Sequence, residues 1–140
     1  MVEFALVLPI LLLLVIGVMD VGKAFRYWLD ETHLANQGAR WVAVNRSLSP
    51  NLGDYLRNQT VNKELHDDSC VTLSYIDMNG NGLKKDVGDA VKVEMKIPFA
   101  WTSLISRLGI AEPVVRASAT MRLEAIPSNH ATEQSWGTCA

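Results

Sequence analysis

The chain has 140 residues and a formal net charge of −2. This length suits one compact domain with an appended element, and the lack of a basic excess argues against nucleic acid as a partner. Hydrophobic residues make up 49% of the sequence but are unevenly placed, since positions 4–19 contain no charged residue. This distribution predicts one segment in an apolar environment and the remainder in water.

The apolar segment reads FALVLPILLLLVIGVM and runs from Phe4 to Met19. As a helix it would span about 24 Å, against a hydrocarbon core of about 30 Å. Residues up to Phe25 lengthen the span if the Lys23 ammonium snorkels to the membrane surface. The segment is therefore predicted to be a membrane-inserted helix.

Three other interpretations of this segment compete with that prediction. A secretory signal peptide needs a basic start and a small-residue cleavage site, whereas Glu3 is acidic and no A-x-A follows. A buried core helix is disfavoured because Leu11, Leu12, Leu13 and Leu14 are apolar all round, and so small a domain can hardly enclose them. A plain membrane anchor is the serious rival.

Two residues distinguish a specialised helix from a plain anchor. A carboxylate such as Glu3 is expensive near bilayer depth and usually has a partner, for example an amine. Pro9 lacks a backbone donor and clashes with the carbonyl of Ala5, so we expect a kink or local melting between these two positions. A plain anchor gains nothing obvious from either feature.

The stretch VEFALVLPILLLLVIGVMDVGKAF, positions 2–25, closely resembles the N-terminus of TadE-like pilins of the tight-adherence pilus system. The shared features are a glutamate followed by Phe, an Ala-Leu pair, a Leu-Pro dipeptide, a leucine run, Gly17, an acidic residue at Asp20, and Gly22. The stretch VVRASATMRLEA, positions 114–125, resembles the closing strand of the family. The resemblance therefore covers both ends of the chain.

The resemblance implies a pilus subunit that inserts in the bacterial inner membrane and is then built into an extracellular, adhesive filament. Its implied partners are copies of itself or other pilins, a prepilin peptidase and the pilus assembly machinery. Glu3 would neutralise the N-terminal amine of a neighbouring subunit, and a buried charge pair of this kind needs both members present. The implied assembly segment comprises Glu3, Phe4, Pro9, Leu11, Leu12, Leu13 and Leu14.

In that family the peptidase cuts after a glycine, and the glutamate then stands fifth in the mature protein. Glu3 is third here and no leader glycine precedes it. We expect either that two mature residues are missing from the sequence or that Met1 marks a processing boundary.

The remaining pattern predicts an α+β head behind the stem helix. Apolar spacings of three and four extend the first helix to about Val44, giving a stem at 1–46 and a head at 47–140. The further predicted elements are a helix over 51–66, strands at Cys70–Ile76, Ala90–Ile97 and Pro113–Ala125, a short helix or turn at 101–108, and a loop-like tail at 127–140. Three or four strands with helices predict an antiparallel sheet.

Cys70 and Cys139 are the two cysteines, and they lie far apart in the sequence. Such a pair fits one loop-closing disulfide in an oxidising compartment, worth roughly 4 kcal/mol on the loop-entropy model. Two unrelated reduced thiols are the alternative.

The segment DMNGNGLKKDVGD, positions 77–89, has spacing similar to that of an EF-type calcium loop. Its candidate ligands are Asp77, Asn79, Asn81, Asp86 and Asp89. Position 12 of that pattern is Gly88 instead of glutamate, and two lysines lie nearby. The favoured interpretation is a metal-free Gly/Asn turn between strands, and the alternative is a calcium-binding turn.

Enzymatic patterns are weak in this sequence. His33, His66 and His130 lie in separate segments without metal-ligand spacing, and no P-loop, G-x-S-x-G or HExxH occurs. We therefore expect a structural protein and not an enzyme. Two rival functions stay open: a membrane-anchored extracytoplasmic binding module that never polymerises, and a calcium-dependent adhesive domain.

Overall fold

The computed structural model describes residues 2–44, 51–101, 106, 109, 111–126, 133–137 and 139. The fold is α+β, as predicted: a long N-terminal helix followed by a head with a small antiparallel sheet. In chain order the elements are α1 (Val2–Ala43), α2 (Leu52–Gln59), α3 (Lys63–Asp68), β1 (Cys70–Ile76), β2 (Ala90–Pro98), β3 (Val114–Arg122) and β4 (Gln134–Trp136).

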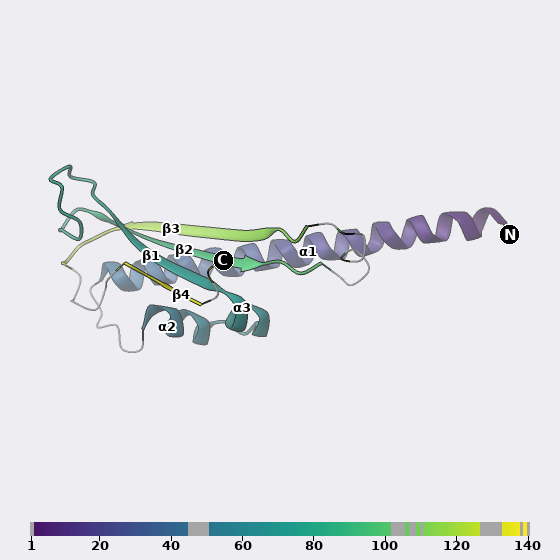
Figure 1. Ribbon diagram of the computed structural model, residues 1–140, viewed down its shortest axis with the longest axis horizontal. Coiled ribbons are helices and arrows are strands. Elements are labelled where there is room, and N and C mark those ends of the chain that lie inside the picture. The colour runs from purple at the N-terminus through teal and green to yellow at the C-terminus, as the bar shows by residue number, and fades with distance from the viewer. Residues whose placement is uncertain are drawn as a thin grey trace.

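The helix α1 has 42 residues and is about 63 Å long at 1.5 Å per residue. Its N-terminal half projects alone from the molecule, and its C-terminal half packs against the head (Figure 1). Pro9 lies inside the continuous helix, so the predicted local melting near this residue is wrong. Pro9 lies beyond the first four N–H groups of α1, so it removes one intrahelical hydrogen bond, to the carbonyl of Ala5, while the helix continues past it.

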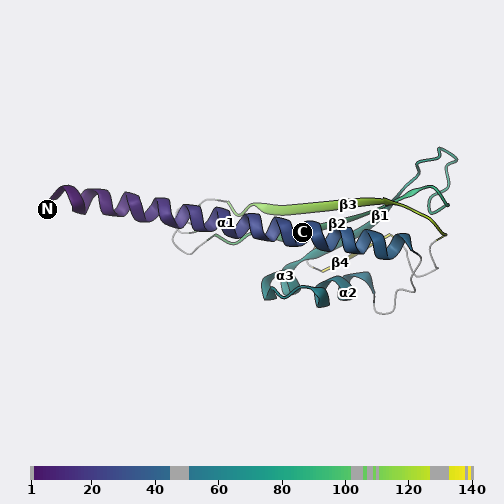
Figure 2. The same cartoon turned by 180° about the vertical axis from the view of Figure 1, so that it is seen from behind.

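The four strands form one sheet in the order β3-β2-β1-β4, with all neighbours antiparallel. The helices cover one face of this sheet, as Figure 2 shows from the helix side, and no helix or strand among the described residues covers the other face. Both β2 and β3 run along α1. Val93 pairs with Leu73 on one side and with Ala119 on the other, so these buried side chains share the covered face.

The core lies between α1 and the sheet. Gly38 allows close packing there, because an added Cβ would lie 3.0 Å from a methyl group of Leu56. Buried residues of α1 at helical spacing fill this layer: Tyr27, Leu34, Ala35, Ala39, Val42 and Ala43. Trp28 also has the spacing of this face, with the buried Ala35 seven positions further on, but it is 45% exposed.

The predicted helix over 51–66 is wrong, since two short helices occupy this region. Thr60 has extended backbone angles and ends α2. The side chain of Asn62 then accepts a hydrogen bond from the N–H of Glu64 and caps the start of α3. Asn is a preferred N-cap residue, and this local bond competes with a continuous helix.

The tail was predicted to be loop-like, but Gln134–Trp136 adds a fourth strand beside β1. Trp136 packs on α2 at Gly53, where an added Cβ would lie 2.6 Å from the Trp136 Cβ. The glycine therefore allows the strand and the helix to meet. The predicted helix or turn at 101–108 lies mostly outside the described residues.

Candidate assembly stem and its junction with the head

The projecting half of α1 is an exposed apolar rod. Every side chain from Phe4 to Val15 is exposed, with 71% of Phe4 and 61% of Leu14 accessible. The predicted assembly residues Phe4, Pro9, Leu11, Leu12, Leu13 and Leu14 all belong to this rod. The backbone of Glu3 lies in α1, and its contact with an amine stays a prediction. By length and composition, α1 is able to cross a membrane.

The rod ends where the head begins. Asp20 is the first charged residue after the apolar segment, and it is only 4% exposed. Positions 4–19 therefore form the largely exposed apolar part of α1, and the residues that follow begin the part docked on the head. Sequence reasoning used Asp20 only for the family resemblance and did not predict its burial.

A polar cluster at the base of the head ties α3 to the stem. Lys23 Nζ lies 3.1 Å from Glu64 Oε2, and the Tyr27 hydroxyl donates to the same carboxylate. The hydrogen bonds from Tyr27 and then Lys23 lower the pKa of Glu64. The Lys23 ammonium also lies 5.7 Å from the ring centroid of Phe99. These contacts are partly solvated, so each contributes modestly to stability.

Glu31 lies on the docked half of α1, beyond the largely exposed apolar part at positions 4–19. Its side chain is 0% exposed, and neither carboxylate oxygen has a hydrogen-bond partner in the described part of the chain. Burial raises the pKa of Glu31 to about 8. An uncompensated buried carboxyl is expected to protonate instead of carrying its charge. No periodicity signal marks this residue, because a glutamate within an amphipathic helix is ordinarily assigned to the solvated face.

The model of the family described as TadE-like protein matches residues 1–40. The N-terminal segment is similar to TadE-like proteins. The match covers the exposed apolar rod and most of the docked half of α1, which confirms the family resemblance found in the sequence. Comparisons with curated proteins and with solved structures gave no significant match.

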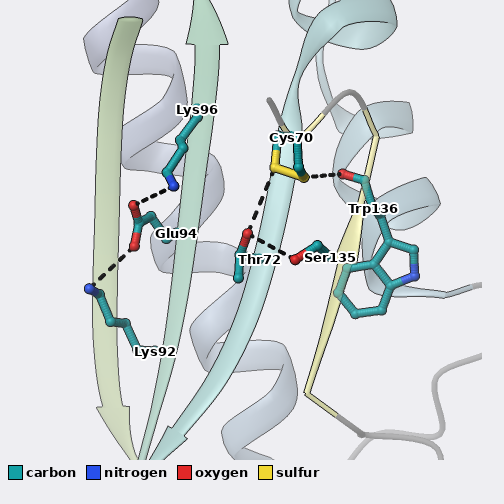
Figure 3. Close-up of polar contacts among 8 residues, drawn as sticks. Cys70, Thr72, Lys92, Glu94, Lys96, Ser135 and Trp136 are labelled. Atoms are coloured by element: carbon teal, nitrogen blue, oxygen red, sulfur yellow. Dashed lines mark hydrogen bonds and ion pairs between the residues drawn. A yellow bond between two sulfur atoms is a disulfide. The ribbon is translucent and has the colours of Figure 1, made fainter.

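Beyond the TadE-like segment, a disulfide joins Cys70 and Cys139, as predicted, with their Cα atoms 5.0 Å apart. Cys70 begins β1 (Figure 3), and Cys139 follows β4, whose last residue, Trp136, pairs with Val71. The two cysteines are 69 positions apart in the sequence. The bond between them closes this loop and holds the short edge strand β4 beside β1. Free cysteines are absent, because the chain has only these two.

The turn at 77–89 uses most of its candidate calcium ligands as acceptors for its own backbone. Asp77 accepts from the N–H groups of Gly80 and Gly82, at 2.7 and 2.9 Å. Asn79 and Asn81 accept in the same way from residues two positions further on. Within the described residues, no three His, Cys, Asp or Glu side chains are grouped to hold a metal. Calcium binding stays a prediction.

Asp86 and Asp89 complete this turn from its second half. Asp86 accepts from the Asn81 side-chain amide at 3.0 Å. Asp89 is fully buried and accepts from the N–H groups of Met78 and Asp86, at 3.2 and 3.0 Å. Asp89 therefore closes the turn at its base, which is a structural role that the spacing did not predict.

We expect Asp89→Ala to lower the free energy of unfolding by about 2–3 kcal/mol, because it leaves two amides at the base of the turn without their charged acceptor. Asp77→Ala serves as the matched control, since it removes two similar bonds at an exposed site where water can replace them. Thermal unfolding of both variants in detergent measures the difference. Equal losses would contradict the role of Asp89.

Proposed function

We propose that this chain is a pilin-like subunit of a Tad pilus, held in the cytoplasmic membrane by its stem and then packed through that stem into an extracellular adhesive filament. The family match and the apolar helix are consistent with a Tad pilus component. The observation that carries the proposal is the exposed apolar rod from Phe4 to Val15, which none of the head residues that the structure describes covers. The proposed role is structural and requires no catalysis.

The exposed apolar surface of the rod must be shielded from water both in the membrane and outside it. In a bilayer, lipid chains cover the exposed leucines at no cost. Outside the bilayer, each Å² of apolar surface left in water costs about 25 cal/mol, so a stem drawn from the membrane must be covered by other stems. Rods that project beyond their heads are able to pack side by side with parallel polarity. A filament with stems inside and heads outside satisfies this requirement.

Glu3 supplies the proposed register between stems. It stands at the start of the apolar rod, where an unpaired carboxylate would be costly in lipid or among packed stems. An N-terminal amine of a neighbouring subunit would neutralise it and fix the axial offset between the two. Prepilin peptidase and the assembly machinery are proposed as partners that process and extract the subunit.

We expect Glu3→Ala to reduce surface filaments at least tenfold while the amount of membrane-inserted protein stays unchanged, because insertion needs only the apolar segment. Sheared surface material, quantified by immunoblotting and negative-stain imaging, measures assembly, and membrane fractionation measures insertion. Asp30→Ala is the matched control, since it removes an exposed carboxylate further along α1 and leaves the rod intact.

A membrane-anchored binding module that does not polymerise is the alternative function. It predicts equal membrane levels for wild type and Glu3→Ala, and no filament containing this chain in either strain. Normal fibres in cells lacking the gene would also overturn the proposed filament role.

A further inference from the structure

The uncovered face of the sheet differs in charge from the rest of the molecule. Side chains at alternate positions of each strand share this face, and within the strands its charged members are Lys92, Glu94, Lys96, Arg116 and Arg122. Four basic residues against one acidic residue leave an excess of three positive charges, although the whole chain carries −2. The nearest acidic residues along β3, Glu112 and Glu124, lie beyond its two ends.

Glu94 is the single acidic side chain of these strands on this face, and it already pairs with two lysines. Its two carboxylate oxygens lie 3.3 Å from Lys92 Nζ and 3.3 Å from Lys96 Nζ (Figure 3). Partial burial acts to raise the pKa of Glu94, but the bonds from Lys96 and Lys92 together outweigh it and lower the pKa. Arg116 and Arg122 have no ion pair within the part of the chain that the structure describes.

Lys96 and Arg116 are direct cross-strand partners. Hydrogen bonds from Phe99 N to Pro113 O and from Leu123 N to Asp89 O show that odd-numbered pairs of β2 and β3 exchange the backbone bonds. The Lys96–Arg116 pair is therefore of the non-hydrogen-bonded kind, in which the side chains are closest. Like charges at such a position destabilise a sheet.

We propose that this face binds an acidic polysaccharide, which would lie along β2 and β3 with its carboxylates against Lys92, Lys96, Arg116 and Arg122. This inference rests on the proposed function, because it names the class of surface to which the filament would adhere. An anionic ligand would relieve the repulsion between Lys96 and Arg116 that the free protein carries.

Charge complementarity and position favour this occupant over others. The face points away from α1, so stems packed in a filament core leave it on the outside (Figure 1). Because β2 and β3 run along α1, a stem that crosses the membrane would hold these strands away from the membrane plane. The charged face would then not lie flat against the lipid headgroups. Hydroxyl side chains on the same face suit sugar hydroxyls. Ser118 and Thr120 lie between Arg116 and Arg122 on β3, and Thr72, Ser74 and Ser135 lie on the neighbouring strands β1 and β4. The same face carries no aromatic residue in its strands on which a nucleic-acid base would stack.

The test uses the full chain in neutral detergent micelles, with polygalacturonate as the acidic probe and with dextran and duplex DNA as comparison polymers. We expect Lys96→Gln combined with Arg116→Gln to weaken polygalacturonate binding at least tenfold at low ionic strength. Arg40→Gln combined with Lys63→Gln removes the same charge from the helix layer and should change binding less than twofold. Wild-type binding should also weaken as salt is raised, because screening reduces the attraction between exposed charges.

The two double variants also separate binding from folding. Relief of the like-charge pair should leave the melting temperature of the Lys96→Gln, Arg116→Gln variant equal to or above that of wild type. Equal polygalacturonate binding by wild type and this variant would overturn the proposal, as would tighter binding to DNA or equal binding to dextran. The assay uses unassembled chains, so its result is independent of whether Glu3→Ala abolishes filaments.

Discussion

Raising the pH from about 5 to about 8 is expected to lower the free energy of unfolding of the head by about 3 kcal/mol, through Glu31. In the unfolded chain this carboxyl titrates near its ordinary pKa of 4.5, whereas in the folded chain burial raises its pKa to about 8. Well below pH 4.5 both states hold the proton, so the ionisation of Glu31 no longer changes stability. Between the two values the unfolded state loses the proton first, so stability falls by up to 1.36 kcal/mol per pH unit and levels off above the folded pKa.

Glu31→Leu tests this expectation, because it removes the titrating group from an apolar site. We expect the variant to be more stable than wild type at pH 8 and to lose most of the decline between pH 5 and 8, measured by thermal unfolding in detergent. Glu94→Gln is the control and should keep the decline. Its pKa is lowered in the fold, so the stability it contributes is lost only as the pH falls below about 4.5. An unchanged slope in Glu31→Leu would contradict the role of Glu31.

Gly137→Ala is expected to lower the free energy of unfolding by about 3 kcal/mol or more. Gly137 has a φ angle of 96°, which costs an L-residue about 1–2 kcal/mol. An added Cβ would also overlap the backbone carbonyl of Ser69 and the guanidinium of Arg57, which donates to that carbonyl at 3.0 Å. Relief of this overlap must move the end of β4, which the disulfide at Cys139 holds in place.

Gly80→Ala separates the two contributions. Gly80 has a similar positive φ angle of 72°, but nothing lies within 4 Å of an added Cβ. It should therefore cost only the conformational part, about 1 kcal/mol. Thermal unfolding of both variants under oxidising conditions compares the two losses of unfolding free energy. If Gly137→Ala loses no more than Gly80→Ala, the atoms around Ser69 move aside at little cost and the predicted packing contribution is wrong.

The elements with strong periodicity were predictable from the sequence. The strand at Cys70–Ile76 matches the predicted bounds, and Ala90–Ile97 differs from β2 by one residue. Alternation is a reliable signal when one face of a sheet is buried and the other is solvated. The stem was predictable for a similar reason, since a long uncharged segment has few other solutions.

The failures occur where a few local bonds decide the outcome. The break between α2 and α3 depends on one capping side chain, Asn62, within an otherwise helical pattern. The strand β4 is three residues long and is held by a distant disulfide and by Trp136 on Gly53, so its own sequence carries almost no signal. Trp28 has the spacing of the buried face of α1 but is 45% exposed, so helical spacing alone does not decide burial.

The sequence predicted that the N-terminal segment is an apolar helix, but it did not predict which acidic residues of this helix are buried. The apolar rod follows directly from composition, whereas the burial of Asp20 and Glu31 required the position of the sheet relative to α1. The charge of the uncovered sheet face was hidden for the same reason. Lys96 and Arg116 are 20 positions apart in sequence, and only the register of β2 and β3 makes them neighbours.

The parallel course of α1, β2 and β3 has a mechanical consequence. If the stem is anchored in a fibre and the sheet grips an external surface, tension acts along the helix and along the strands together. The two layers must then slide past each other, so their packed side chains and the strand hydrogen bonds are loaded simultaneously instead of one after another. Such shear geometry resists rupture far better than peeling, which suits a component that must hold under flow.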